Sequence, residues 1–444
     1  MEALVHKLET KIEETRARVR SLLEQHRHIK VGEVNIEQVI GGMRGVKGLV
    51  SDISYLDPEE GIRFRGLTIP ETLAQLPKPP GKRMPYVEAQ FYLLLTGDIP
   101  NQDEVQEIID AFEERAALPH FVIDVLRAIP RDTHPMTMFS AAVLTLQRQS
   151  RFAKAYSEGI SKQEYWPLYL EDALNLIAKL PAIAAYIYRM RYRGDTPLFR
   201  QPGLDFGASF AQMMGIKAPY DDAARLYFIL HADHELGNVS AHATHLVASA
   251  LSDPYYALSA GLNGLAGPLH GLANQEVLRW IMGALAKLGC GAPSKEHPAT
   301  ACTRADLERF VYETLDSGQV IPGFGHAVLR KTDPRYIALW DYMEERAPDY
   351  YLFQIVKQLY DIIPPVLQDL GKVKNPWPNV DGISGVIQYY HGITEFDFYT
   401  VLFGIGRALG VLANTVWDRA LGLPLERPKS LTLGMLESLA AKAG

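Results

Sequence analysis

Cysteine and long apolar runs are scarce in this sequence of 444 residues. Its only two cysteines, Cys290 and Cys302, form no C-x-x-C motif. That pattern argues against a disulfide framework or a structural zinc site, so we expect free thiols in a reducing compartment. No apolar run reaches the roughly 18 residues that a membrane-spanning helix needs. We therefore expect no membrane association.

Excess positive charge is also lacking. The sequence has 45 Lys and Arg against 52 Asp and Glu, a net charge of -7, which gives no electrostatic case for binding nucleic acid or an anionic membrane. Any anion site must therefore be local. The first residues have neither the apolar stretch of a signal peptide nor the acid-poor composition of a transit peptide, so we expect a cytoplasmic protein.

Helical periodicity dominates what is present. Apolar residues recur at helical spacing over residues 4–25, which predicts one long amphipathic helix. Similar stripes occupy residues 105–112 and residues 174–180, before Pro181. Residues 240–251 are rich in alanine and serine, which predicts a buried helix packed closely on a neighbour, plausibly at a subunit contact. The sequence predicts a mainly α protein.

A small β-hairpin is expected near the amino terminus. Residues 48–54 and 62–65 are β-prone, and the turn-like residues 57–61 separate them.

Two glycine and proline stretches divide the helical pattern. Residues 261–271 predict a hinge or domain boundary, and their one ionisable residue is His270. Residues 375–385 likewise contain one ionisable residue, Asp381. We interpret the span between these stretches as a smaller domain inserted into the helical body.

The third notable stretch is residues 320–336, V-I-P-G-F-G-H-A-V-L-R-K-T-D-P-R-Y. Its glycines allow the backbone at His326 to approach a ligand closely. Arg330, Lys331 and Arg335 follow at once and place fixed positive charge near the histidine. The pattern predicts an anion site, although a surface loop with solvated basic residues has the same composition.

Histidines also cluster in two H-x-x-H pairs at His231, His234, His242 and His245. A zinc site would use such spacing, but no cysteine contributes and no H-E-x-x-H motif is present. Hydrogen-bonded structural histidines, or histidines that recognise an anion or a carbonyl, fit the pattern better. A histidine-rich metallohydrolase and a non-catalytic helical scaffold remain alternative functions.

His270, His326 and Asp381 together suggest acid–base chemistry in one site. A carboxylate can remove a proton next to a carbonyl if a neutral imidazole donates a hydrogen bond to the enolate oxygen that forms. Arginines would hold a dicarboxylic partner, because each guanidinium offers paired donors matched to a carboxylate.

Three motifs carry a family resemblance: G-P-L-H-G-L-A-N-Q-E at residues 267–276, P-G-F-G-H-A-V-L-R-K-T-D-P-R-Y at 322–336 and N-P-W-P-N-V-D at 375–381. They resemble citrate synthase, closest to the mitochondrial, dimeric type, and the resemblance covers almost the whole chain. It implies a multi-helical fold with a large dimerisation domain, residues 1–269 and 387–444, and a small domain, residues 270–386, that carries coenzyme A and catalytic residues.

The resemblance also implies a function and its residues. The reaction would be condensation of acetyl-CoA, as co-substrate, with oxaloacetate, then hydrolysis to citrate, with no permanently bound cofactor or metal. His270 would stabilise the enol of acetyl-CoA, Asp381 would take the methyl proton, and His326 would polarise the oxaloacetate carbonyl. The nearest alternative is 2-methylcitrate synthesis from propionyl-CoA.

The remaining residues that the resemblance implies bind or support the substrates. Those for oxaloacetate would be His234, Arg335, Arg407 and Arg427, the last completing the site of the second subunit in a homodimer. Those for coenzyme A would be Arg44, Lys162, Arg330 and Lys374. Asn238 and Ser240 would support them. If the chain is a processed form, the mitochondrial matrix is the alternative to the cytoplasm.

Overall fold

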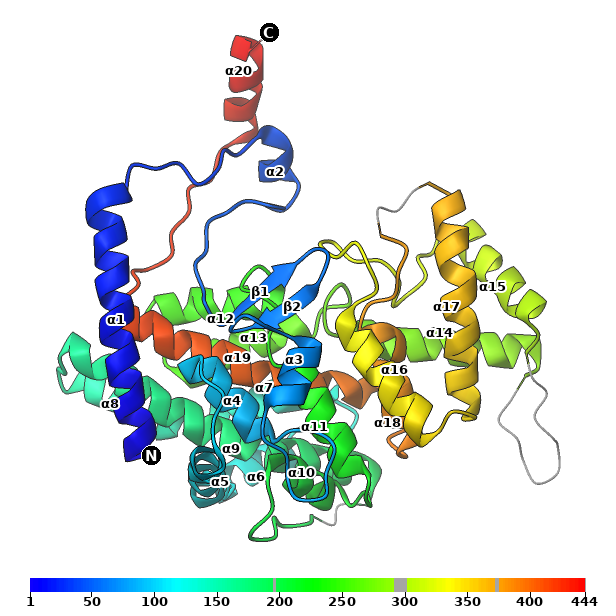
Figure 1. The fold of residues 1–444 in the computed structure, drawn as a ribbon, viewed down its shortest axis with the longest axis horizontal. Helices are drawn as coiled ribbons and strands as arrows, with labels where there is room; N and C mark the ends of the chain where they lie inside the picture. Colours follow the sequence, from blue (N-terminus) through cyan, green and yellow to red (C-terminus); the bar gives the residue numbers. More distant parts are fainter. Residues whose placement is uncertain (195–196, 291–301, 372–374, 444) are drawn as a thin grey trace.

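Helices make up 64% of the structure and the only sheet among the described residues is small, so the predicted mainly α class is confirmed (Figure 1). The computed structural model describes residues 1–194, 197–290, 302–371 and 375–443. The first element, α1 (Glu2–His26), is the predicted amphipathic helix. It buries Leu4, Leu8 and Ile12 against the body of the molecule.

The predicted hairpin is present, but its first strand lies later than expected. β1 (Ser54–Asp57) pairs antiparallel with β2 (Gly61–Phe64), and β3 (Leu67–Thr68) extends the sheet. Residues 48–50, which are β-prone, are exposed and not in a strand. The strand begins where the alternation of buried and exposed side chains begins, because a sheet needs a buried face more than it needs β-branched residues.

A large helical body follows the sheet. Its helices are α3 (Ile69–Gln75), α4 (Val87–Thr96), α5 (Gln102–Arg115), α6 (His120–Ala128), α7 (Pro135–Thr145), α8 (Arg151–Ser157), α9 (Tyr165–Tyr192), α10 (Phe206–Met214), α11 (Tyr220–Leu230), α12 (Val239–Ser249) and α13 (Pro254–Leu265). α5 and α9 contain the two predicted apolar stripes, and α9 continues through Pro181.

The predicted helix at residues 240–251 is α12, which packs along α13. The expected hinge at residues 261–271 is partly wrong, because its first five residues belong to α13. A Cβ at Gly261 would lie 2.1 Å from the Thr244 hydroxyl oxygen. This glycine therefore serves close helix packing, and the chain turns only after Leu265.

A second group of helices lies at the right of Figure 1, beside the body. It consists of α14 (Ala273–Leu288), α15 (Arg304–Asp316), α16 (Pro334–Arg346), α17 (Tyr351–Asp369) and α18 (Asp381–Tyr390). The chain then returns through the body as α19 (Tyr399–Leu421) and ends in α20 (Leu433–Ala443).

One apolar stretch, Phe396–Leu421, is long enough to cross a membrane by length and composition, which the sequence patterns did not predict. Of its most apolar window, 89% is buried inside the protein. It contains α19, which packs against α9, α11 and α12. This segment is therefore the central core helix of the body.

Cys290 and Cys302 form a disulfide, so the expectation of two free thiols is wrong. Their Cα atoms are 5.4 Å apart, and both residues are buried. The bond ties the end of α14 to the start of α15. Sequence spacing could not reveal the pairing, because it depends on how closely the two helix ends approach.

The double variant Cys290→Ser, Cys302→Ser should unfold at a lower temperature than wild type. The two cysteines are 12 residues apart, and in the chain-entropy account a cross-link over a loop of about this length raises the free energy of unfolding by about 3 kcal/mol. Thermal unfolding of both proteins with and without dithiothreitol checks this. Reductant should lower the wild-type midpoint and leave the double variant unchanged, and a wild-type midpoint insensitive to reductant would contradict the pairing.

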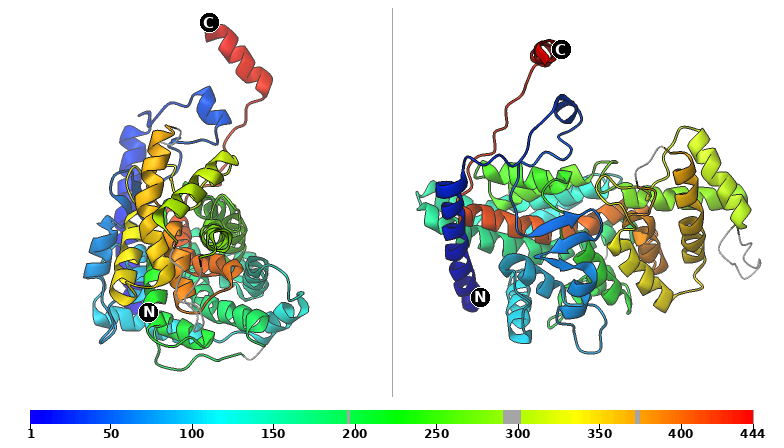
Figure 2. Two further views of the ribbon diagram at one scale, coloured as in Figure 1. Left: turned by 90° about the vertical axis from the view of Figure 1, so that its right-hand side faces the viewer. Right: turned by 45° about the horizontal axis from the view of Figure 1, so that its top comes forward.

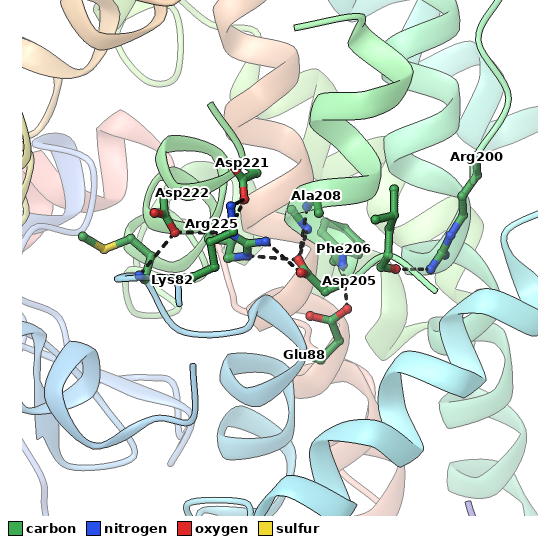
Figure 3. Close-up of polar contacts among 12 residues, drawn as sticks. Lys82, Glu88, Arg200, Asp205, Phe206, Ala208, Asp221, Asp222 and Arg225 are labelled. Atoms are coloured by element: carbon green, nitrogen blue, oxygen red, sulfur yellow. Dashed lines mark hydrogen bonds and ion pairs between the residues drawn. The ribbon is translucent and has the colours of Figure 1, made fainter. Parts of the chain in front are cut away.

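A buried charge network joins α10 and α11 (Figure 3). The Arg225 guanidinium is 1% exposed and donates to Asp205 at 2.7 Å, Asp221 at 2.9 Å and Asp222 at 3.1 Å. The buried guanidinium is tolerated because each of its three nitrogens donates a hydrogen bond to a carboxylate. The network holds α11 in place, and residues 231–238 follow directly from that helix.

Two further contacts extend this network toward neighbouring segments. Lys82, from the proline-rich connector, reaches Asp221 at 2.6 Å, and Arg346, at the end of α16, lies 3.6 Å from Asp222. Nearby, the Glu88 carboxylate accepts a hydrogen bond from the Phe206 backbone at 2.7 Å. Burial raises the pKa of Glu88 to about 8, so this carboxyl is mostly protonated at neutral pH.

Two segments form extended arms. The amino-terminal arm, residues 27–50 with α2 (Ile36–Ile40), follows α1, and the carboxyl-terminal arm, residues 423–443 with α20, leaves the body after its first few residues (Figures 1 and 2). Large apolar side chains are exposed along these arms, among them Ile29, Val31, Ile40, Leu433 and Met435. A single chain does not cover them.

Candidate active site

Four segments bring the candidate residues together at the junction of the body and the second helix group. His234 follows α11, His270 lies in the turn between α13 and α14, His326 lies in the loop before α16, and Asp381 is the first residue of α18. The ring centroids of His234 and His326 are 5.4 Å apart. Residues far apart in the sequence therefore meet at one site.

Close backbone packing fixes the loop that carries His326. Gly323 has φ +80°, and a Cβ there would lie 2.8 Å from the Cα of Gly382. Only glycine combines this conformation with such an approach. Asn379 secures the same contact, because its backbone donates to the Gly323 carbonyl at 3.0 Å and its side chain donates to the Gly325 carbonyl at 2.9 Å.

The backbone around His326 determines where its ring proton lies. Nδ1 accepts hydrogen bonds from the backbone N–H groups of Val328 and Leu329, both at 3.0 Å. Since backbone N–H groups only donate, the proton is on Nε2. Burial, with Arg335 nearby, lowers the pKa of His326 to about 4. At neutral pH the ring is therefore an uncharged donor through Nε2.

His270 is also a neutral donor, but through its other nitrogen. Its Nε2 accepts from the Ser240 backbone N–H at 3.2 Å and lies 2.8 Å from the Ser240 hydroxyl. The ring proton is therefore on Nδ1. Burial, and then Arg407, lowers the pKa of His270 to about 3, which keeps the ring uncharged.

Asp381 is a candidate proton acceptor, unlike the two neutral histidines, which are hydrogen-bond donors. Its Oδ1 is enclosed and has no hydrogen-bond partner, while its backbone donates to the Asn379 side chain at 3.0 Å. Burial raises the pKa of Asp381 to about 7, against the opposing charges of Arg335 and Arg407. A carboxylate of this pKa can accept a proton from a substrate near neutral pH.

Arg407 is 2% exposed and projects from α19. Within the described residues, its hydrogen bonds go only to uncharged oxygens, namely Asn238 Oδ1 at 2.8 Å, Ser240 Oγ at 3.0 Å and the His231 carbonyl at 3.3 Å. Burial lowers its pKa to about 10, so it stays positive at neutral pH. A buried cation without a bonded carboxylate favours an anionic ligand.

Arg335 supplies the second buried cation. Asp333 holds it through its Nε and one terminal nitrogen, at 3.1 and 2.6 Å. Asp333 also caps the start of α16 by accepting from the Arg335 backbone at 2.9 Å. The carboxylate therefore fixes the guanidinium on the first turn of the helix.

The structure does not bring every predicted residue to this site. Arg44, Lys162, Arg330 and Arg427 are exposed in the single chain, and Lys374 lies outside the described residues. Arg330 is nevertheless tied to the hairpin, because its backbone donates to the Pro58 carbonyl at 2.8 Å. The expected supporting roles of Asn238 and Ser240 match the contacts to Arg407 and His270 above.

Two important neighbours were missed by sequence reasoning. The Phe403 ring lies 5.0 Å from the Arg407 guanidinium and 6.1 Å from the His270 ring. The available signal was its position four residues before Arg407, which would place the two side chains on the same face of a helix. Asn379 was missed although it stands in the motif that carries Asp381, because its role depends on the distant loop at Gly323.

Three of the four histidines that suggested zinc have other hydrogen-bond partners. His231 donates through Nδ1 to the Tyr227 carbonyl at 2.8 Å and stacks on the Tyr227 ring at 4.1 Å. His242 and His245 pair with carboxylates. Among the described residues, no three potential ligands converge on one metal position.

A family model described as "Citrate synthase, C-terminal domain" matches residues 42–429, most of the chain. The chain belongs to the citrate synthase family. It is accordingly an acyltransferase that uses acetyl-CoA as co-substrate and needs no permanently bound cofactor.

Individual relatives agree over nearly the full length. The chain is 50% identical to "Probable citrate synthase, mitochondrial" of Glossina morsitans morsitans, over 98% of this chain and 92% of that protein. It is 49% identical to "Citrate synthase, mitochondrial" of Daucus carota, over 97% and 90%. Both names are mitochondrial, which weighs against the expected cytoplasmic location.

A solved structure confirms the fold. It is the ternary complex of carboxymethyl coenzyme A and oxaloacetate with citrate synthase from Thermoplasma acidophilum, with a TM-score of 0.74 and 23% identity. The match covers 90% of this chain and 97% of that one.

The raised pKa of Asp381 predicts a pH profile. A base with a pKa of about 7 is active only when deprotonated, so kcat/KM should fall about tenfold per pH unit below 7 and level off above it. Asp381→Asn should lower turnover by at least 10²-fold and abolish this limb of the profile. Steady-state rates from pH 5.5 to 8.5 check this. Near wild-type turnover in the Asn variant would remove Asp381 from the mechanism.

Proposed function

We propose that this site condenses acetyl-CoA with oxaloacetate and hydrolyses the product to citrate and free coenzyme A. The proposal rests on one observation: the candidate base and the two candidate hydrogen-bond donors have different protonation states. Asp381 has a pKa raised to about 7, while His270 and His326 are held as neutral donors. One base beside two uncharged donors is what carbon–carbon bond formation between two carbonyl compounds requires.

The steps follow from those states. Asp381 takes a proton from the acetyl methyl group, and the His270 Nδ1–H donates to the thioester oxygen as the enolate develops. The His326 Nε2–H donates to the ketone oxygen of oxaloacetate, which becomes negative as the methyl carbon attacks. Water then cleaves the thioester and releases coenzyme A. Hydrogen bonds that strengthen as charge develops lower the barrier.

The carboxylates of oxaloacetate have matched partners. Arg335 and Arg407 supply buried guanidinium groups, and His234 lies beside His326 at the same place. We assign the fourth contact to Arg427 of the partner subunit, because Arg427 lies on an exposed arm in its own chain. The apolar side chains exposed on both arms support a homodimer in which each copy covers the arms of the other.

Coenzyme A would be held by basic side chains around the site. We assign its phosphates to Arg44, Lys162, Arg330 and Lys374, of which the first three are exposed in the single chain. Carboxymethyl coenzyme A and oxaloacetate, the ligands of the Thermoplasma acidophilum complex, support this pair of substrates for the fold. The reaction would be the entry step of the tricarboxylic acid cycle, and the names of the relatives favour a mitochondrial setting.

Steady-state assays with oxaloacetate and either acetyl-CoA or propionyl-CoA test the proposal. We expect citrate and free coenzyme A from acetyl-CoA, with a higher kcat/KM than for propionyl-CoA. An extra methylene in a closed pocket costs about 1 to 3 kcal/mol, or roughly 10- to 200-fold. Preference for propionyl-CoA would instead identify a 2-methylcitrate synthase, and no condensation with either substrate would refute the proposal.

Oxaloacetate should raise the affinity for an inert acetyl-CoA analogue by about 5- to 150-fold, the usual range of coupling between sites. His326 and Arg335, which would hold oxaloacetate, share one loop and helix start with Arg330, which would hold coenzyme A. Movement of residues 270–386, the proposed small domain, would therefore complete both sites together. Calorimetric titration with and without oxaloacetate measures the coupling, and equal affinities would exclude ordered closure.

A further inference from the structure

A histidine and carboxylate cluster lies on α12, outside the residues that the proposed reaction uses. His242 Nε2 is 2.7 Å from Glu426 Oε1, and His245 Nε2 is 3.6 Å from Glu426 Oε2. The other nitrogen of His245, Nδ1, lies 2.8 Å from Asp418, near the end of α19. Two carboxylates from different segments therefore enclose one imidazole.

The residues of this cluster are largely buried and hold one another in place. His245 and Asp418 are 8% and 3% exposed, and Glu426 Oε2 is enclosed. Burial alone would lower the pKa of His245, but the hydrogen bond to Asp418 and the charge of Glu426 outweigh it and raise the pKa. Arg419, also on α19, opposes this effect. The arrangement favours a positive ring between two anions.

Glu426 belongs to the carboxyl-terminal arm and fastens it to α12 at two points. Besides its side-chain contacts, its backbone N–H donates to the Ser249 hydroxyl at 3.1 Å. The residues on either side, Leu425 and Arg427, are exposed. Anchoring Glu426 therefore fixes where the neighbouring Arg427 leaves the body.

The same helix also supports the active site. Asn238, the N-cap of α12, accepts from Arg407, and Ser240 contacts both Arg407 and His270. The start of α12 thus binds the Arg407 guanidinium of its own subunit, and the rest of the helix binds the carboxyl-terminal arm through Glu426.

We infer that Glu426 is a positioning residue for the condensation reaction. It seats the arm on His242, His245 and Ser249 so that Arg427 is presented at a fixed place to the substrate site of a second copy. This inference rests on the proposed function, which assigns Arg427 to the oxaloacetate site of the partner subunit. Without the anchor, the arm samples many positions and only a fraction of sites contain the fourth cation.

The test compares Glu426→Gln with Glu437→Gln. Both remove one carboxylate from the carboxyl-terminal segment, but Glu437 lies exposed on α20. A hydrogen bond to a charged group is worth about tenfold or more in an equilibrium, so Glu426→Gln should raise the KM for oxaloacetate by about 10-fold. The KM for acetyl-CoA, measured at saturating oxaloacetate, should not change, and Glu437→Gln should behave as wild type.

A double-variant cycle separates positioning from a general structural effect. Arg427→Ala should raise the KM for oxaloacetate on its own, and adding Glu426→Gln to it should have no further effect. Trypsin cleavage after Lys429, followed by mass spectrometry, reports arm seating without any assay of activity, since the Arg427–Pro428 bond itself resists trypsin. Cleavage should be faster in Glu426→Gln than in wild type or Glu437→Gln.

The possible failures are distinct. A wild-type protein that forms no citrate overturns the proposed function. An active wild type with an impaired Arg427→Ala, but an unchanged KM and cleavage rate in Glu426→Gln, overturns the positioning role alone. Additive effects of Glu426→Gln and Arg427→Ala also overturn it, because Glu426 would then act independently of Arg427.

Discussion

The candidate active site depends on one buried cation, Arg407, to which no described carboxylate is hydrogen-bonded. Arg407 sits inside the body, and its hydrogen bonds reach only neutral oxygens from residues 231–240. Keeping a charge there requires several well-aligned acceptors, which in turn fixes the turn after α11 and the start of α12. Ser240, which accepts a hydrogen bond from Arg407, also lies 2.8 Å from His270 Nε2 and so helps to fix the orientation of that ring. A buried guanidinium with neutral hydrogen-bond partners favours binding of an anion, which in the proposed reaction would be a carboxylate of oxaloacetate.

Glycine makes this arrangement sterically possible. A Cβ at Gly410 would lie 2.5 Å from the Ala232 carbonyl oxygen, so α19 can approach the turn after α11 only because that position is bare. Gly323 has the same function between the His326 loop and α18. Close backbone contacts of this kind resist deformation and hold the reactive groups in register.

The sequence predicted much of this through local patterns. Periodicity predicted α1, α5 and part of α9, and a stretch rich in alanine and serine predicted α12. Long motifs predicted His270, His326 and Asp381 as site residues. What it could not predict depends on distant partners. The ring tautomers are set by backbone donors, Phe403 matters only because two other segments reach it, and the Cys290–Cys302 bond requires two helix ends to meet. Glycine content suggested a hinge at Gly261, where it instead permits helix packing, because composition does not distinguish flexibility from close approach.

The exposed arms have a consequence for how the protein is made. Ile40, Leu433 and similar side chains are exposed in a single chain, and in the proposed homodimer a second copy would cover them. At low protomer concentration such surfaces meet any other apolar surface first, so aggregation and proteolysis compete with pairing. The yield of intact protein should therefore be decided by the kinetics of encounter between protomers as well as by the stability of each fold.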